Sequence, residues 1–157
     1  MLTSAMLNPY ASFLGDRDPL AVIAATPGRL AALSAAPGRA PAPGKWDVRQ
    51  ILCHLADCEI TFGFRMRQAV AEEHHTIQPF DQDRWAAAYA AYDTKAALDV
   101  FRSLRDWNVK FVAAQPAEVF GKPLTHPERG TMTFRTLVET MAGHDLNHLK
   151  QIEALAG

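Results

Sequence analysis

The chain lacks an excess of either charge, and it lacks any long hydrophobic run. Its 157 residues include 16 lysines and arginines against 17 aspartates and glutamates, which gives a formal net charge of −1. Without a basic surplus, we expect no nucleic-acid partner. No stretch approaches the roughly eighteen uninterrupted apolar residues of a membrane span, and residues 1–15 lack the pattern of a signal peptide. We therefore expect no membrane partner either.

Cysteine is also scarce, since Cys53 and Cys58 are the only two. They are five residues apart in a predicted helix, so their side chains point about 140° apart and cannot form a disulfide unless the helix breaks. Two nearby unpaired thiols are typical of a reducing compartment, which predicts a cytoplasmic location.

Runs of alternating β-branched residues are missing as well, so we predict no strand. Residues 116–130, which are rich in proline and glycine, are expected to form a loop. Hydrophobic residues make up 48% of the chain and charged residues 21%. This balance suits a single domain over residues 1–157, with a core that needs no disulfide.

Four long helices are predicted, at about residues 18–36, 47–71, 94–114 and 133–155. The first begins at the N-cap Asp18 and is expected to kink or break at Pro27, and the second begins with a capping box at Asp47. Residues 72–93 are long enough to be a crossover between the second and third helices, with a short helix at 81–91. The predicted fold class is all-α, a four-helix bundle.

Six histidines are the one unusual feature of the composition. The apolar stripe of the fourth helix includes His144 and His148, which lie one turn apart. On the second helix, His54 lies three residues after Ile51 and four before Cys58, so it also faces the core. A buried imidazole without a partner costs about 1–3 kcal/mol, so three that face one core need a shared explanation.

A divalent metal ion would supply that explanation. Two histidines at i and i+4 can share one ion, and a third ligand from a neighbouring helix leaves coordination positions open, as in catalytic zinc sites. The alternative is that the histidines are hydrogen-bonded in the core or half exposed. Spacing alone leaves both interpretations open, because it does not show that the two helices are neighbours.

Three nearby residues are candidates for supporting roles. Asp57, three residues after His54, is predicted either to hold a ligand imidazole or act as a catalytic base, or to form a salt bridge at the rim. Cys58 is either a fourth ligand or a small buried hydrophobe. Gln151, three residues after His148, either orients a ligand or forms a hydrogen bond at the end of the bundle.

The remaining histidines and the arginines have less specific expectations. We expect His74 and His75 to be solvated, and His126 to form a loop hydrogen bond or to approach the mouth of the metal site. Solvated faces, with one or two side chains free to pair with a substrate carboxylate, are expected for Arg65, Arg67, Arg102 and Arg105.

Two segments resemble motifs of the DinB/YfiT superfamily. Residues 46–59, WDVRQILCHLADCE, resemble its opening motif with the pattern H-L-x-d-x-E. Residues 144–152, HDLNHLKQI, together with the loop from His126 that precedes them, are similar to its closing H-x-x-x-H-x-x-Q-I helix. The resemblance covers about residues 18–155 and implies a four-helix bundle in which the second and last helices meet.

The resemblance also implies a function. Similar proteins bind a divalent metal, zinc or nickel, at positions that match His54, His144 and His148. Members with a known activity resemble metal-dependent thiol transferases that use thiols such as bacillithiol or mycothiol, and many are dimers. We therefore expect a homodimeric thiol S-transferase that acts on a small molecule. The same site could instead support hydrolysis, and the alternative is a non-catalytic module that binds a metal or a small ligand.

Overall fold

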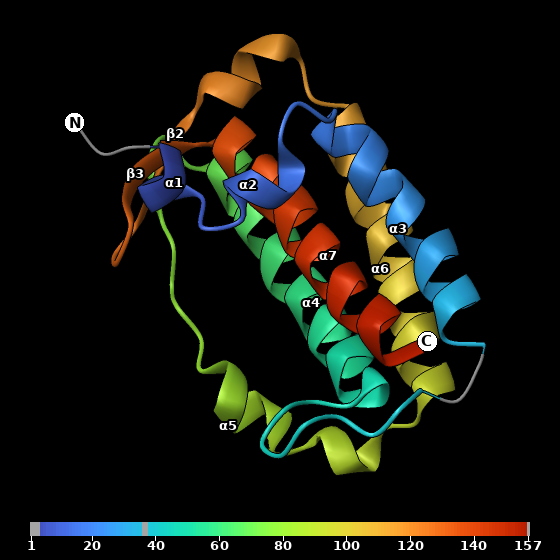
Figure 1. Cartoon of the computed structure of the whole chain (residues 1–157). Helices are drawn as coiled ribbons and strands as arrows, with labels where there is room; N and C mark the ends of the chain where they lie inside the picture. Colours follow the sequence, from blue (N-terminus) through green and yellow to red (C-terminus); the bar gives the residue numbers. More distant parts are fainter. Residues whose placement is uncertain (1–3, 36–37, 157) are drawn as a thin grey trace.

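Four long helices form the bundle in the computed structural model, which describes residues 4–35 and 38–156 (Figure 1). They are α3 (Pro19–Leu33), α4 (Val48–Ala71), α6 (Thr94–Ala113) and α7 (Phe134–Ala156). All four predicted helices are thus confirmed, with ends that differ by a few residues. The first was predicted to reach Ala36, which lies outside the described residues. No described helix is both long and apolar enough to cross a membrane.

Local capping explains where these helices begin. The carboxylate of Asp18 accepts hydrogen bonds from two backbone amides in the first turn of α3, and Pro19 occupies the first helical position. Asp47 and Gln50 form the predicted capping box at α4. At α7, the hydroxyl of Thr133 accepts a hydrogen bond from a first-turn amide. Each cap satisfies amides that have no partner within the helix.

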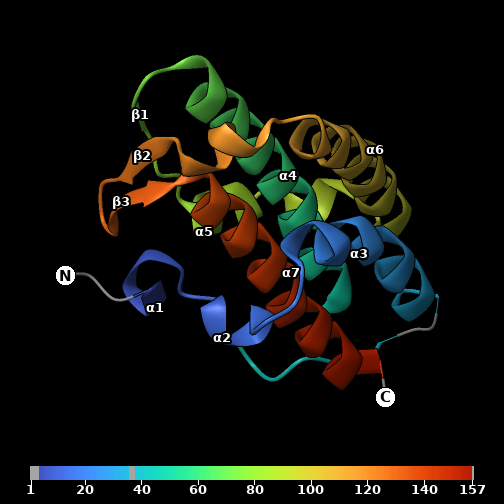
Figure 2. The ribbon, with the colours of Figure 1, turned by 90° about the horizontal axis from the view of Figure 1, so that it is seen from above.

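The order of the helices in space differs from their order in the chain. α3 and α4 each pack against both α6 and α7, so the consecutive helices α3 and α4 lie diagonally across the bundle (Figure 2). α4 and α6 run in the same direction in Figure 1, so residues 72–93 must return along the length of the bundle. This confirms the predicted crossover. Its predicted short helix is divided into α5 (Gln82–Ala86) and a 3₁₀ turn, η1 (Tyr89–Ala91).

A small sheet at one end of the bundle shows that the prediction of no strands was wrong. β2 (Pro123–His126) and β3 (Gly130–Thr133) form an antiparallel hairpin within the predicted loop, after a 3₁₀ turn, η2 (Ala117–Gly121). β1 (His75–Thr76) pairs with β2 in parallel. Strands of two to four residues are too short to give a periodic pattern, and the β1–β2 pairing joins segments far apart in the chain.

The N-terminal segment forms two short helices, α1 (Ser4–Leu7) and α2 (Ala11–Leu14). α2 packs against α7, whereas α1 contacts α2 and β3. A Cβ at Gly143 would lie only 2.5 Å from the carbonyl oxygen of Tyr10, so this close approach requires glycine. The contact brings the rings of Tyr10 and His144 together nearly perpendicular to each other, with centroids 5.2 Å apart.

α3 continues through Pro27 without the break that was predicted as one outcome. Proline has no N–H group, so the carbonyl of Ile23 loses its usual helical donor. The Nη1 group of Arg105 donates a hydrogen bond to that carbonyl at 2.9 Å instead. Arg105, which was expected on a solvated face, is only 1% exposed. The proline is thus accommodated by a side chain from another helix.

Arg105 also pairs with two buried carboxylates. Its guanidinium donates hydrogen bonds to Glu59 on α4 and, through both terminal nitrogens, to Asp145 on α7. Thr26 of α3 donates a further hydrogen bond to Asp145 at 2.6 Å. One buried network therefore connects all four long helices.

Replacing Arg105 by leucine is expected to lower the free energy of unfolding by about 3–5 kcal/mol, because two carboxylates would stay buried without their cation. Urea unfolding would measure this loss. Arg102→Leu, an exposed position on the same helix, should change stability by no more than about 0.5 kcal/mol. A loss below about 1 kcal/mol for the Arg105 variant would show that the network does not hold the helices together.

Candidate metal centre

Three histidines from two helices converge in the middle of the bundle. The Nε2 atom of His144 on α7 lies 3.1 Å from Nε2 of His54 on α4 and 3.1 Å from Nε2 of His148 on α7. All three residues are buried, with at most 7% of their surface exposed. α4 and α7 are therefore neighbours, which spacing alone could not establish. Their packing brings the predicted ligand residues together.

Neighbouring side chains hold the three rings. The Nδ1 atom of His148 lies 2.8 Å from Oε1 of Gln151, so an Nδ1–H group that donates there leaves Nε2 free to bind an ion. Trp46 packs against the ring of His54 with centroids 5.0 Å apart, and Tyr10 packs against His144. Of the two roles predicted for Gln151, the contact favours orientation of a histidine.

The electrostatic environment keeps these imidazoles neutral. Burial lowers the pKa of His54 to about 3, and the charge of His148 contributes to the shift. Burial also lowers the pKa of His144 well below its usual value, and that of His148 to a smaller degree. Neutral imidazole is the form that binds a metal. Three converging neutral Nε2 atoms thus fit a divalent ion, which would satisfy all of them at once.

Cys58 lies close to the three histidines, but its sulfur is not positioned to share an ion with them. Ligand atoms of His54, Cys58 and His144 lie within 4.8 Å of one another. However, the sulfur is 3.5 Å from Nε2 and 3.8 Å from Nδ1 of His54, nearly the same distance. A ligand that shared an ion with Nε2 would lie beyond that atom, and therefore much farther from Nδ1. The thiol, whose pKa is raised mainly by burial, therefore lies beside the ring of His54, and its sulfur is also 3.9 Å from Nε2 of His144.

Two cavities meet at the histidines. A small cavity of about 110 Å³ contacts His144, and an open cleft of about 750 Å³ contacts His148. His54, Tyr10 and Gln82 line both. An ion between the imidazoles would therefore be accessible from both sides of the cluster.

The other predicted residues lie in several different places. Asp57 does not line either of these cavities, and its carboxyl pKa is raised mainly by burial, so its catalytic role stays a prediction. His74 is exposed as expected, but His75 is buried, with Nδ1 2.9 Å from a carboxylate oxygen of Glu72. His126 forms the predicted loop hydrogen bond through Nδ1, and its ring lines the small cavity.

Sequence reasoning did not find three residues that line the small cavity. Tyr10 comes from the N-terminal segment, Gln82 from the crossover and Arg129 from the β2–β3 turn. None of them lies at a helical spacing from a histidine. Only the tertiary contacts of their segments could have identified them.

Without metal, the protein is expected to lose stability as the pH falls from about 7 to about 5. Below a pKa of about 6.5 the unfolded chain takes up protons on these histidines, whereas His54, with a folded pKa of about 3, does not. The loss should approach about 1 kcal/mol per pH unit for each buried histidine. Urea unfolding of chelator-treated protein at several pH values would measure it.

His54→Gln should make that pH dependence shallower, because the variant has one titrating group fewer. His74→Gln, at an exposed position, provides the control and should keep the wild-type slope. If the His54 variant kept the full slope as well, the buried histidines would not be its cause.

Comparison with known proteins supports a relationship over most of the chain. The model of the DinB superfamily matches residues 21–152. A protein of Oceanobacillus iheyensis, described provisionally as a metal-dependent hydrolase, is 29% identical over 117 residues, or 71% of this chain and 66% of that protein. One of Bacillus mycoides with the same description is 28% identical, over 71% and 65%. The chain thus spans just under two thirds of the length of these relatives.

A solved structure shares the fold. YfiT from Bacillus subtilis, described as a probable metal-dependent hydrolase with an unusual four-helix bundle topology, superimposes with a TM-score of 0.77 at 20% identity. The match covers 87% of this chain and 84% of that one. At this identity the likeness establishes the four-helix bundle alone. Because the superfamily model matches most of its length, the chain belongs to the DinB superfamily.

Proposed function

We propose that this protein is a metal-dependent enzyme whose divalent ion is held by His54, His144 and His148. The convergence of their three Nε2 atoms at the meeting point of two cavities is the observation that carries the proposal. The provisional description of the relatives as metal-dependent hydrolases is in keeping with it. Zinc and nickel are the ions we expect, since imidazole suits both.

The chemistry follows from three neutral ligands with open positions beside them. A bound divalent ion lowers the pKa of a coordinated thiol or water, which then becomes a nucleophile at neutral pH. The protein supplies imidazole rings that are held in place by contacts with Gln151, Trp46 and Tyr10. These contacts would hold the three nitrogens in position without movement during the reaction.

Two cavities of unequal size favour a reaction with two substrates, and we propose thiol S-transfer. The cleft of about 750 Å³ is large enough for a low-molecular-weight thiol of the bacillithiol or mycothiol type. The cavity of about 110 Å³ suits a small electrophile. In the reaction the thiol sulfur bonds to the electrophilic carbon, the leaving group departs with the electron pair of its bond to carbon, and the thiol proton goes to solvent.

Hydrolysis is the second candidate, because the relatives are described as hydrolases. Water would then replace the thiol as the nucleophile, and the cleft would serve only as an entrance. Product analysis separates the two reactions. A thioether that forms only when a low-molecular-weight thiol is present supports S-transfer, whereas turnover at an unchanged rate without thiol supports hydrolysis.

Tag-free protein supplied with zinc or nickel is expected to bind about one equivalent of metal per chain, measured by elemental analysis. Single alanine substitutions at His54, His144 and His148 should reduce the content to below about a tenth and abolish turnover. Cys58→Ala should keep the metal, as should Cys53→Ala, a buried cysteine that serves as its matched control.

Cobalt loading tests the position of the sulfur directly. The cobalt protein should show no thiolate-to-cobalt charge-transfer absorption, because Cys58 lies beside the His54 ring. A strong charge-transfer band that disappears in Cys58→Ala would make the cysteine a fourth ligand. That result would close the tetrahedral site and remove the basis for catalysis.

We also propose that the protein is a homodimer. Three exposed apolar side chains, Ile60 and Phe64 on α4 and Trp85 on α5, line one surface groove that a second copy of the chain would cover. Light scattering after gel filtration should give twice the monomer mass. Phe64→Glu should give a monomer, whereas Tyr92→Glu, at an exposed site outside the groove, should not. A wild-type monomer would contradict this proposal.

A further inference from the structure

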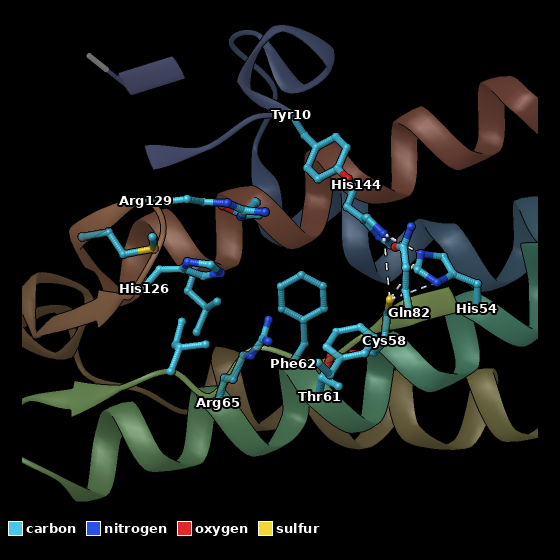
Figure 3. A pocket seen from close by; sticks show the side chains of 15 residues that line it. Tyr10, His54, Cys58, Thr61, Phe62, Arg65, Gln82, His126, Arg129 and His144 are labelled. Carbon is cyan, nitrogen blue, oxygen red and sulfur yellow. Dashed lines mark hydrogen bonds between the residues drawn. The ribbon is translucent and has the colours of Figure 1, made fainter. Parts of the chain in front are cut away.

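The small cavity has a second polar end, opposite the histidines. Arg65 reaches it from α4, and Arg129 and His126 reach it from the β2–β3 hairpin. Figure 3 shows Arg129 and His126 on one side of this cavity and His54 and His144 on the other, with the ring of Phe62 between them. A molecule in the cavity would therefore meet two cationic side chains at one end and the proposed metal ligands at the other.

Neither arginine has a carboxylate partner within the described part of the chain. Arg65 donates one hydrogen bond, to the carbonyl of Gln78 at 3.2 Å, and lies over the ring of Phe80. The guanidinium of Arg129 forms no hydrogen bond or ion pair with any described residue. Arg105, by contrast, forms ion pairs with two carboxylates. Two partly buried cations that share one cavity without an anion between them leave positive charge uncompensated. An anionic ligand would compensate it.

The groups around this end of the cavity also favour an anion. Burial and the charge of Arg129 both lower the pKa of Arg65, which indicates that the two cations repel each other across the cavity. Burial, together with both arginines, lowers the pKa of His126. The Nδ1 atom of His126 accepts a hydrogen bond from the Glu128 amide, so its proton is on Nε2, where it can serve as a donor. An anion at this end would find charged and neutral donors together.

We propose that this end of the cavity binds the carboxylate of a small electrophilic acid, held by Arg65 and Arg129 while its reactive carbon lies toward the histidines. The proposal rests on the proposed function, since it names the class of the electrophile. Size supports a short acid. The cavity of about 110 Å³ is smaller than the engineered cavities of about 150 Å³ that accept benzene. Planar guanidinium groups match a carboxylate well.

A matched pair of electrophiles tests the proposal. Chloroacetate and chloroacetamide have the same shape and leaving group but differ in charge. For the zinc-loaded full chain with a low-molecular-weight thiol, we expect Arg65→Gln and Arg129→Gln to lower kcat/KM for chloroacetate, relative to chloroacetamide, by about tenfold to a hundredfold. Arg135→Gln, at an exposed position outside the cavity lining, should keep the wild-type ratio.

A binding measurement separates failure of this inference from failure of the proposed function. Calorimetric titration of the zinc-loaded and chelator-treated full chain with propionate and propionamide needs no turnover. Propionate binding that is lost in Arg129→Gln supports the carboxylate site even if no reaction is found, in which case the proposed function alone fails. Equal binding of acid and amide, or an unchanged chloroacetate preference in both variants, overturns the inference, even while chloroacetamide turnover would uphold the proposed function.

Folding of the variants is a limited concern. Arg129 lies in a turn and its side chain bonds to no described residue, so its replacement should leave the fold intact. Thermal melting monitored by circular dichroism would verify this. If Arg65→Gln proved unstable because of its contact with Gln78, the Arg129 variant by itself would decide the outcome.

Discussion

The buried ion pairs of Arg105 set the register in which the long helices meet. This side chain reaches the carbonyl of Ile23 on α3, Glu59 on α4 and Asp145 on α7 from its own position on α6. Asp145 directly follows His144, and Glu59 is five residues after His54. A buried charge network tolerates little displacement, because each lost contact would leave an unpaired ion in the core. The alignment that satisfies Arg105 is thus also the one that brings the histidine nitrogens together.

Between two hydrophobic clusters, α7 carries a polar layer. Phe134 and Met141 belong to one cluster and Ile152 to the other, while His144 and His148 lie between them. The layer has two halves with opposite chemistry. In one half, Arg105, Glu59 and Asp145 each have a partner of opposite charge. In the other, three neutral imidazoles face cavities. A half held by ion pairs beside an accessible half is a suitable arrangement for holding an ion while substrates enter.

Much of this could be predicted from local signals. Helical periodicity placed His54, His144 and His148 on buried faces, and the N-caps at Asp18 and Asp47 marked helix starts correctly. These features depend on residues within one or two turns of each other, so spacing is sufficient to detect them. The role of Cys58 could not be decided in this way. A helical wheel places it on the same face as His54, but only coordinates show the sulfur beside the ring.

The sequence by itself determined the helices, their caps and the histidines that face the core, because each depends on neighbours along one helix. Only the tertiary structure decided the β1–β2 pairing and the burial of Arg105 beside the carbonyl that Pro27 leaves without a donor. It also decided that Tyr10 and Arg129 line the small cavity. Each of these joins segments far apart in the chain. Such contacts arise from packing between elements, and periodicity within one element carries no information about which other element will pack against it.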